Sequence, residues 1–486
     1  MAGPEAMRIA SALALAAAFI AAAFAGCIGT NDAPSQDPVD PATTDAAKPR
    51  VVIAVIDTGM NLFHEEYRRA GFEPPAYLPA DATVVRLDFD AADFEPAVAK
   101  NRAALDALEA KKLYTFPGTK VVGAISFRSE KLDGWPLILD KPKSYTHGTM
   151  TTSRAAGNTI AIGGADDVDL VIVQGFSPEA VAWAADQPWI DIISISAGIS
   201  PYSIVPLVPN LLDNGGIEAY VKASHAKPFF ASTGNGVGNM GLLGFPSWLR
   251  GTSGVPDAIS VGANDNDKMS HWHNQDPYIS ADGCDNPAAS ASSTAKIADT
   301  GGGTSSATPF SAGGGAKMLL EARRILGHTA VGAVVDSTLT LPSGAWDSLR
   351  KADESVVLAR ADGNATLPAA GPLADGVFTL REFKDVLYHT ALAKPTNDPS
   401  DGRACGAEPA GGVVPGDAIP EDARFAWQGY GEVNHLSIEA AVKVLAGESE
   451  LPKRPGADRE YARVHAIKSG VVTGPLADVP APLALQ

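Results

Sequence analysis

From residue 51 onward, the chain alternates short apolar runs with stretches of helical pattern. The runs are rich in Val and Ile, which is typical of strands buried on both faces of a parallel sheet. They are Val51–Ile56, Val168–Gln174, Ile190–Ser196, Pro228–Ser232 and Ala258–Val261. Pro178–Asp186 and Gly216–Ala226 lie between runs and are predicted to be helices. The alternation predicts an α/β fold with right-handed crossovers, in which ligands bind at the carboxyl ends of the strands.

Two stretches interrupt this alternation. Residues 62–143 are polar and mixed, with a helical patch at Asn101–Lys112, and residues 326–377 contain Gly, Pro and Asp. We expect both to be insertions into a single domain spanning 50–446. Residues 447–486 are predicted to be a loosely held tail.

The N-terminal segment has the pattern of a targeting signal. After a short start with one Arg, Ile9–Ala25 is almost entirely apolar and is followed by Gly26 and Cys27. Small residues before a Cys resemble the lipobox of prokaryotic lipoproteins, so residues 1–27 are predicted to be a signal peptide with Cys27 as the lipid attachment site. The alternative is ordinary signal cleavage with an incidental Cys. Residues 28–49 are rich in Pro, Asp and Thr and are expected to form a flexible acidic tether.

Charge and cysteine content limit the possible partners. The 486 residues carry a formal net charge of −18, which argues against nucleic acid because that partner requires clustered positive charge. With Cys27 acylated, Cys284 and Cys405 remain, and outside the cytoplasm they can form a disulfide. Two free buried thiols are the alternative. We predict an extracytoplasmic protein, either secreted or lipid-anchored at a prokaryotic cell surface.

Three short motifs contain the residue types that peptide hydrolysis requires. Asp57 ends an apolar run, where a carboxylate can orient an imidazole, although a turn Asp is equally common there. His147, followed by Gly and Thr, precedes a helical stretch and can present its ring to a cleft, although an isolated His is more often a surface residue. Ser305 follows a Gly run and precedes the helical pattern Ala312–Leu326, so its N–H lies at the positive end of a helix. A simple N-cap Ser is the alternative.

A fourth motif offers a donor for an oxyanion. Asn235 follows the run Pro228–Ser232 within Ser232-Thr233-Gly234-Asn235-Gly236. An Asn amide can stabilise the negative charge that develops on a carbonyl oxygen during acyl transfer. A turn Asn before Gly is the alternative, and it is the commoner use of that pair.

Together these residues resemble the subtilases. That family has the order Asp, His, Ser within Asp-Thr-Gly, His-Gly-Thr and Gly-Thr-Ser-x-Ala-x-Pro blocks, which match the sequence around Asp57, His147 and Ser305. The family's oxyanion block matches Gly234-Asn235, and its late Gly-Tyr-Gly-x-Val matches residues 429–433. Its substrate-binding strand matches Ser196-Ala197-Gly198.

The resemblance implies a three-layer fold with about seven parallel strands and helices on both faces. It implies that His147 is the general base, Asp57 its orienting group and Asn235 an oxyanion donor. Protein or peptide substrates would bind in extended form beside Ser196, Ala197, Gly198 and Gly234. The chain departs from the pattern after His147, where Met150 to Arg154 replace the usual second His and small residues.

No cofactor is expected for the chemistry, and no metal site is assigned. The family often binds calcium, for which Asp166-Asp167-Asp169 and Asp265-Asn266-Asp267 are candidates, although solvated charge explains both. His271 and His273 lack a third ligand.

The predicted function is a serine endopeptidase acting through an acyl-enzyme. The alternative is a catalytically inactive binding module with the same fold. A Ser-Glu-Asp peptidase would lack His147 and have Asp at position 235, and a lipase-like enzyme would require Gly-x-Ser-x-Gly, so both are disfavoured.

Overall fold

A computed structural model describes most of the domain that follows the N-terminal segment. The described residues are 49–91, 93–128, 131, 134–142, 146–163, 167–197, 215–235, 258–265, 268–269, 277–284, 286–300, 302–328, 355–361, 363–393 and 429–453. Residues 1–48, with the predicted signal peptide and nearly all of the tether, lie outside them.

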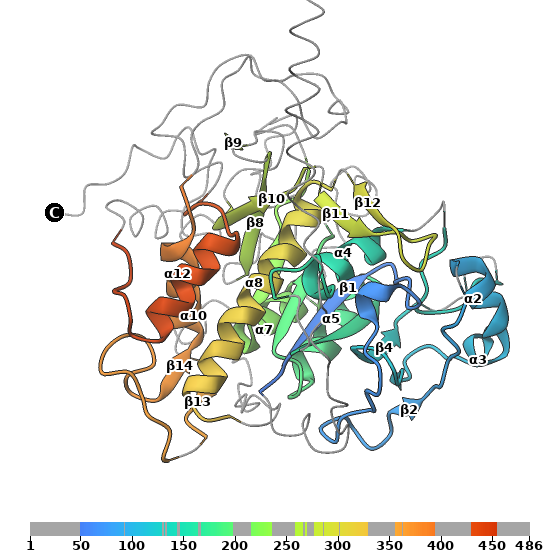
Figure 1. The fold of residues 1–486 in the computed structure, drawn as a ribbon, viewed down its shortest axis with the longest axis horizontal. Coiled ribbons are helices and arrows are strands. Elements are labelled where there is room, and N and C mark those ends of the chain that lie inside the picture. The colour runs from blue at the N-terminus through green and yellow to red at the C-terminus, as the bar shows by residue number, and fades with distance from the viewer. Residues whose placement is uncertain are drawn as a thin grey trace, which may run out of the picture. The chain divides into compact units, whose positions relative to one another are not determined.

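The described residues contain strands and helices in close alternation (Figure 1). The strands are β1 (Val51–Asp57), β2 (Thr83–Val84), β3 (Tyr114–Thr115), β4 (Val121–Ser126), β5 (Val168–Gln174), β6 (Ile192–Ile195), β7 (Phe229–Ser232), β8 (Ile259–Asp265), β9 (Lys268–Met269), β10 (Ile279–Asp282), β11 (Asn286–Ala289), β12 (Ile297–Thr300), β13 (Val356–Ala359) and β14 (Val377–Thr379). The helices are η1 (Glu65–Tyr67), α2 (Phe94–Lys100), α3 (Arg102–Asp106), α4 (His147–Ala156), α5 (Pro178–Asp186), α7 (Gly215–Ala226), α8 (Thr304–Ile325), α10 (Leu380–Thr390) and α12 (His435–Leu445).

The central sheet has the order β10-β8-β7-β6-β1-β5-β4-β3-β2. Each neighbouring pair from β10 to β4 is parallel, which gives the seven parallel strands that the resemblance to the subtilases implies. β3 pairs antiparallel with β4 at one edge, and β9 pairs antiparallel with β8 near the other. β1, which ends at Asp57, therefore lies in the middle of the sheet.

Each strand of the sheet centre has apolar side chains on both faces. In β1, Val51, Ile53 and Val55 join one core cluster, while Val52, Ala54 and Ile56 join a second. Successive side chains of a strand point to opposite faces, so the clusters lie on opposite sides of the sheet. Residues of α4, α8, α10 and α12 belong to the first cluster, and residues of α5 and α7 to the second. The three-layer α/β architecture is thereby confirmed.

The two stretches that the sequence suggests as insertions contribute to this core. β4 lies within 62–143, all six of its residues are buried, and it pairs with β5. The second stretch, 326–377, contributes Leu358 and Leu373 to the first cluster. The run Val121–Ile125 is short and bounded by Lys120 and Ser126, so its pattern does not stand out within a polar segment. Neither stretch is therefore wholly a surface addition.

Two boundaries differ from the sequence-based expectations. α8 begins at Thr304, eight positions before the helical pattern at Ala312, because its first turns contain small residues and Pro309. α3 ends at Asp106 instead of Lys112, and Lys111 has a positive φ of 60°.

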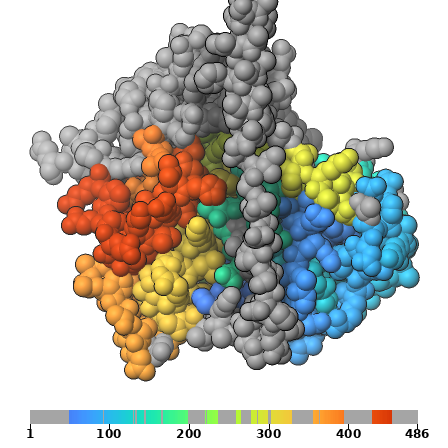
Figure 2. All heavy atoms as spheres, in the orientation of Figure 1, coloured from blue at the N-terminus to red at the C-terminus, as the bar shows by residue number. Residues whose placement is uncertain are grey.

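The predicted tail is held at its start, because Leu451 packs against the first cluster and the Pro452 carbonyl contacts His389 Nδ1 at 3.0 Å. In Figure 2, the red atoms of α12 lie beside the yellow atoms of α8 on the face drawn, and α12 also packs against α10. Within the described ranges, no helix is both long enough and apolar enough to cross a membrane.

Candidate active site

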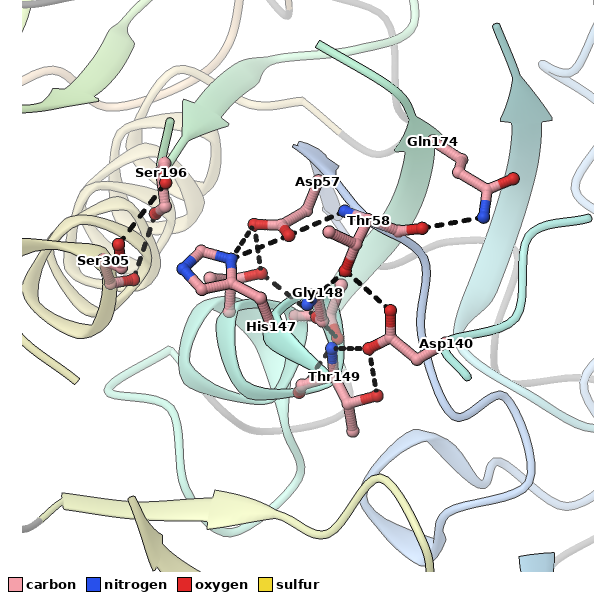
Figure 3. A network of polar contacts seen from close by, with 11 residues as sticks. Asp57, Thr58, Asp140, His147, Gly148, Thr149, Gln174, Ser196 and Ser305 are labelled. Atoms are coloured by element: carbon pink, nitrogen blue, oxygen red, sulfur yellow. Dashed lines mark hydrogen bonds and ion pairs between the residues drawn. The ribbon is translucent and has the colours of Figure 1, made fainter. Parts of the chain in front are cut away.

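The site lies at the carboxyl ends of the central strands, where α4 and α8 begin. Asp57 is the last residue of β1, and its side chain is fully buried. His147 is the first residue of α4, and Ser305 is the second residue of α8. The fold therefore gathers at one edge of the sheet three side chains that are far apart in the sequence (Figure 3).

Asp57 and His147 are directly bonded. The His147 Nδ1 atom lies 2.8 Å and 3.0 Å from the two Asp57 carboxylate oxygens. Asp57 also accepts a hydrogen bond from the Thr58 N–H at 2.7 Å and one from Thr151 Oγ1 at 3.0 Å. Three donors, on His147, Thr58 and Thr151, thus hold the carboxylate in place. Because the carboxylate accepts from Nδ1, it determines that this ring nitrogen of His147 carries a proton.

Both burial and neighbouring charges shift the pKa of the His147 imidazole. Burial alone would lower its pKa, but the charge of Asp57, the hydrogen bond to Asp57 and the charge of Asp140 together raise it above 6.5. About a third of the side chain, 36%, remains exposed. A ring that is anchored on one edge and open on the other can exchange protons with a neighbouring group.

Ser305 lies on the open side of this ring. Figure 3 shows the imidazole between Asp57 and Ser305, with its far nitrogen directed to the side where Ser305 lies. The Ser305 Oγ atom donates to the backbone carbonyl of Ser196 at 3.4 Å, a long and weak hydrogen bond.

Pro309 explains how Ser196 contacts Ser305. In a regular helix the N–H of residue 309 would bond to the carbonyl of Ser305, but a proline has no N–H. The Ser196 hydroxyl donates to that carbonyl instead, at 3.0 Å. Pro309 therefore leaves the Ser305 carbonyl free of a bond within the helix. The Ser196 hydroxyl uses that carbonyl as its acceptor, which links the end of β6 to the start of α8.

Asn235 caps α8 from a different part of the chain. The residue before the helix, Gly303, offers no side-chain cap, and Asn235 Oδ1 accepts from Thr304 N at 3.0 Å and from Thr304 Oγ1 at 2.8 Å. These bonds use the amide oxygen and leave Nδ2 as the donor. Gly303 has a φ of 61°, and a Cβ there would lie 2.6 Å from the Asn235 amide, so glycine is required.

The backbone N–H of Ser305 is a second donor at this helix start. The neighbouring Ser306 N–H bonds to Gly303 O at 3.0 Å. Among the described residues, no acceptor is recorded for the N–H of Ser305. Two donor groups, Asn235 Nδ2 and Ser305 N, thus belong to residues at the start of α8.

α4 is capped in a similar way, by residues that the sequence analysis did not single out. Its N-cap residue, Thr146, makes no side-chain cap bond. Asp140 accepts from Thr149 N at 2.6 Å, and Thr58 Oγ1 accepts from Gly148 N at 2.9 Å. Both helix starts of the site are thus fixed by side chains from elsewhere. Thr58 and Thr149 lie within the recognised motifs, but no local pattern points to Asp140.

The remaining predicted residues have mixed outcomes. Gly234 is described, with a φ of 88°, and Ala197 packs against the second core cluster. Gly198 lies outside the described residues, as do Cys27 and Cys405. Cys284 is buried and disulfide-bonded, but its partner lies outside the described residues, so the pairing with Cys405 stays a prediction.

The calcium candidates are only partly described. Asp169 is fully buried, bonded to Arg50 Nε at 2.6 Å and to Arg69 at 3.2 Å, so its carboxylate belongs to an ion-pair network. Asp166, Asn266 and Asp267 lie outside the described residues, as do His271 and His273. Among the described side chains, no group of three or more His, Cys, Asp or Glu is placed to hold a metal ion. Calcium binding therefore stays a prediction.

Solved structures with similar folds include the prenylagaramide maturation protease PagA, at 16% identity and a TM-score of 0.38 over 82% of this chain and 95% of that one. The protease domain of PatA matches at 13% identity and a TM-score of 0.41, covering 84% of this chain and 99% of that one.

A cold-adapted subtilisin-like serine proteinase matches at 18% identity and a TM-score of 0.31, over 58% of this chain and 78% of that one. The comparison with curated proteins finds no significant match. The family model described as "Subtilase family" matches residues 48–352, more than half of the chain and all of the segment from β1 to α8. The chain therefore belongs to the subtilase family of serine proteases.

Proposed function

We propose that the protein is a serine endopeptidase in which Asp57, His147 and Ser305 form the catalytic triad. The observation that carries the proposal is the Asp57–His147 bond at 2.8 Å together with the position of Ser305 on the open side of the ring. The bond at Nδ1 leaves Nε2 as the atom that can accept a proton.

The proposed reaction proceeds in two halves. In the first, His147 Nε2 takes the proton of the Ser305 hydroxyl while Oγ forms a bond to the scissile carbonyl carbon. His147 then gives that proton to the leaving amine as the C–N bond breaks, which leaves an acyl-enzyme. In the second, water attacks the acyl carbon, with His147 again acting as base, and Ser305 is released with its proton restored.

Asn235 and the Ser305 N–H are the proposed oxyanion donors. A tetrahedral intermediate places negative charge on the former carbonyl oxygen, and pre-positioned donors stabilise that charge without having to reorganise. The bonds from Thr304 to Asn235 Oδ1 support this role because they fix the plane of the amide and thereby the direction of Nδ2.

An extended peptide is the proposed substrate. The end of β6 and Ser196-Ala197-Gly198 would bind it as an added strand, with backbone hydrogen bonds supplying affinity. Of these residues, Ser196 is held by its hydroxyl bond to Ser305 O, so the strand end and the nucleophile are fixed relative to one another.

We propose an extracytoplasmic location, with acylation at Cys27. The disulfide at Cys284 supports such a location because structural disulfides persist mainly in oxidising compartments. Metabolic labelling with radioactive palmitate in a bacterial host tests the anchor. Label in the wild type and none in Cys27→Ala is expected, and equal labelling of both would contradict it.

Digestion of a peptide library tests the enzymatic proposal. The wild type is expected to cleave internal peptide bonds, and Ser305→Ala to lose this activity. Ser306→Ala is the matched control, because Ser306 is the adjacent residue and its buried hydroxyl has no hydrogen-bond partner among the described residues. Cleavage that persists in Ser305→Ala would refute the proposal, and a wild type that cleaves nothing would favour the binding module.

A further inference from the structure

Asp140 lies behind the Asp57–His147 pair and is fully buried. Its Oδ1 accepts from Thr58 Oγ1 at 2.7 Å. Its Oδ2 accepts from Thr149 N at 2.6 Å and from Thr149 Oγ1 at 2.7 Å. One carboxylate thus binds both the residue that follows Asp57 and a residue two positions after His147.

These contacts form a closed link between the two catalytic segments. Thr58 Oγ1, which donates to Asp140, accepts from the N–H of Gly148 at 2.9 Å. Thr149 Oγ1, which also donates to Asp140, accepts from the N–H of Asn61 at 2.8 Å. The first turn of α4 is therefore fastened to the chain that follows β1 through groups centred on Asp140.

The loop that carries Asp140 is held in a strained conformation. Ile138 has a φ of 75°, in a region that β-branched residues rarely adopt. Its N–H bonds to Gln174 Oε1 at 2.8 Å, and its carbonyl accepts from Met60 N at 2.9 Å. The Asp140 N–H in turn bonds to the Met60 carbonyl at 3.1 Å. Strain of this kind persists only where surrounding contacts fix the backbone, and here they fix the position of one carboxylate.

The charge environment makes this carboxylate costly to keep ionised. Burial raises the pKa of Asp140 to about 6, and the charge of Asp57 adds to the increase, while the Thr149 and Thr58 bonds oppose it. The titratable groups coupled to Asp140 are Asp57, His147 and Tyr67. A buried carboxylate that is ionised near neutral pH beside a second carboxylate indicates a functional role, since perturbed ionisable groups cluster at functional sites.

We propose that Asp140 is a positioning residue for the base His147, acting by holding the first turn of α4 against the Asp57–Thr58 segment and by placing a negative charge behind the ring. It touches neither His147 nor the reacting atoms directly. The inference rests on the proposed function, because it assigns Asp140 to the same catalytic site.

A purely structural role predicts a different set of effects, and Glu66 provides the comparison. Glu66 is also a buried carboxylate, and it binds the chain just beyond the other end of α4 through Thr159 N at 2.9 Å and Thr159 Oγ1. Glu66→Gln therefore removes a similar charge and weakens a similar cap, but far from His147.

The experiment compares Asp140→Asn with Glu66→Gln. Asparagine matches the size of Asp140 and can still accept from Thr149, but its Nδ2 cannot accept from Thr58. We expect kcat on a peptide substrate to fall about tenfold or more in Asp140→Asn, with KM within about twofold, since a displaced base slows the chemical step. Glu66→Gln is expected to keep kcat within about twofold of the wild type.

A second readout does not depend on activity. In a Ser305→Ala background, the His147 pKa is followed by NMR titration of the imidazole. Asp140→Asn removes a negative charge that raises this pKa, so the midpoint is expected to move to lower pH, and it is expected not to move in Glu66→Gln.

The outcomes separate this inference from the proposed function. An unchanged kcat and an unmoved His147 midpoint in folded Asp140→Asn would overturn the positioning role, as would an equal loss of kcat in Glu66→Gln. If Ser305→Ala cleaves peptides as well as the wild type, the proposed function fails, whereas the NMR shift still reports on Asp140. If Asp140→Asn does not fold, Thr58→Val tests the positional part of the inference, because it removes the hydroxyl between Asp140 and Gly148 and keeps the carboxylate. A fall in kcat is then expected, and an unchanged kcat in folded Thr58→Val would overturn the positioning role.

Discussion

Adding one methyl group at Gly148 would force the catalytic segments apart. Gly148 follows His147 at the start of α4, and a Cβ there would lie 1.9 Å from the carbonyl oxygen of Gly59 and 2.8 Å from its nitrogen. Both are backbone atoms of the turn that follows Asp57, so no side chain can rotate away. Reaching an ordinary contact of 3.4 Å requires an opening of 1.5 Å, the difference between 3.4 and 1.9 Å.

An opening of this size acts directly on the Asp57–His147 bond. A misplacement of 1 Å in a catalytic constellation costs about 100-fold in rate, so Gly148→Ala is expected to lower kcat/KM by at least that factor. This corresponds to about 2.7 kcal/mol of transition-state stabilisation. Overpacking is expected to lower the free energy of unfolding by about 1–3 kcal/mol as well.

Steady-state kinetics on a fluorogenic peptide and urea denaturation measure the two effects. Gly363→Ala is the matched control, since nothing lies within 4 Å of a Cβ at that glycine. It is expected to behave as the wild type. A Gly148→Ala enzyme that is folded and retains kcat/KM within threefold would refute the claim that close approach of these two segments sets the catalytic geometry.

Three further changes test other parts of the site. Asn235→Ala is expected to lower kcat about 100- to 1,000-fold with little change in KM, and to lower the free energy of unfolding by about 1 kcal/mol because α8 loses its cap. Ser196→Ala removes the hydroxyl that bonds to the Ser305 carbonyl, so urea denaturation should show a loss of about 1 kcal/mol. In the proposed mechanism the base is neutral His147, whose pKa is raised above 6.5, so kcat/KM should rise with pH through that raised pKa. In Asp57→Asn the midpoint should move to lower pH, because the charge that raises the His147 pKa is gone, and an unmoved midpoint would contradict this assignment.

Much of the fold could be predicted from the sequence because its strands carry a strong local pattern. β5 and α5 have the boundaries expected from the apolar run Val168–Gln174 and from the helical stretch Pro178–Asp186. β5 is buried along its length, and α5 buries one apolar face while its polar ends are exposed, so local pattern and tertiary environment agree. β4 was not predicted, since a six-residue run containing Gly123 gives little signal inside a long polar segment.

The residues of the candidate site could be listed from motif order, but their supports could not. The order of Asp57, His147 and Ser305 and the motifs around them suggest a triad, and the Asp57–His147 bond agrees with that prediction. Asp140 is bonded to Thr58, 82 positions before it in the sequence, and its role depends on a strained loop. Contacts between distant segments leave no periodicity or local motif, so only the three-dimensional arrangement could identify that carboxylate.

Labelling by a fluorophosphonate tests the central claim most directly. The account holds that the fold activates one hydroxyl, that of Ser305, through His147. Mass spectrometry of tryptic peptides should find the label on Ser305 in the wild type and no label in His147→Ala. Labelling of a different serine, or equal labelling of Ser305 in folded His147→Ala, would contradict the account.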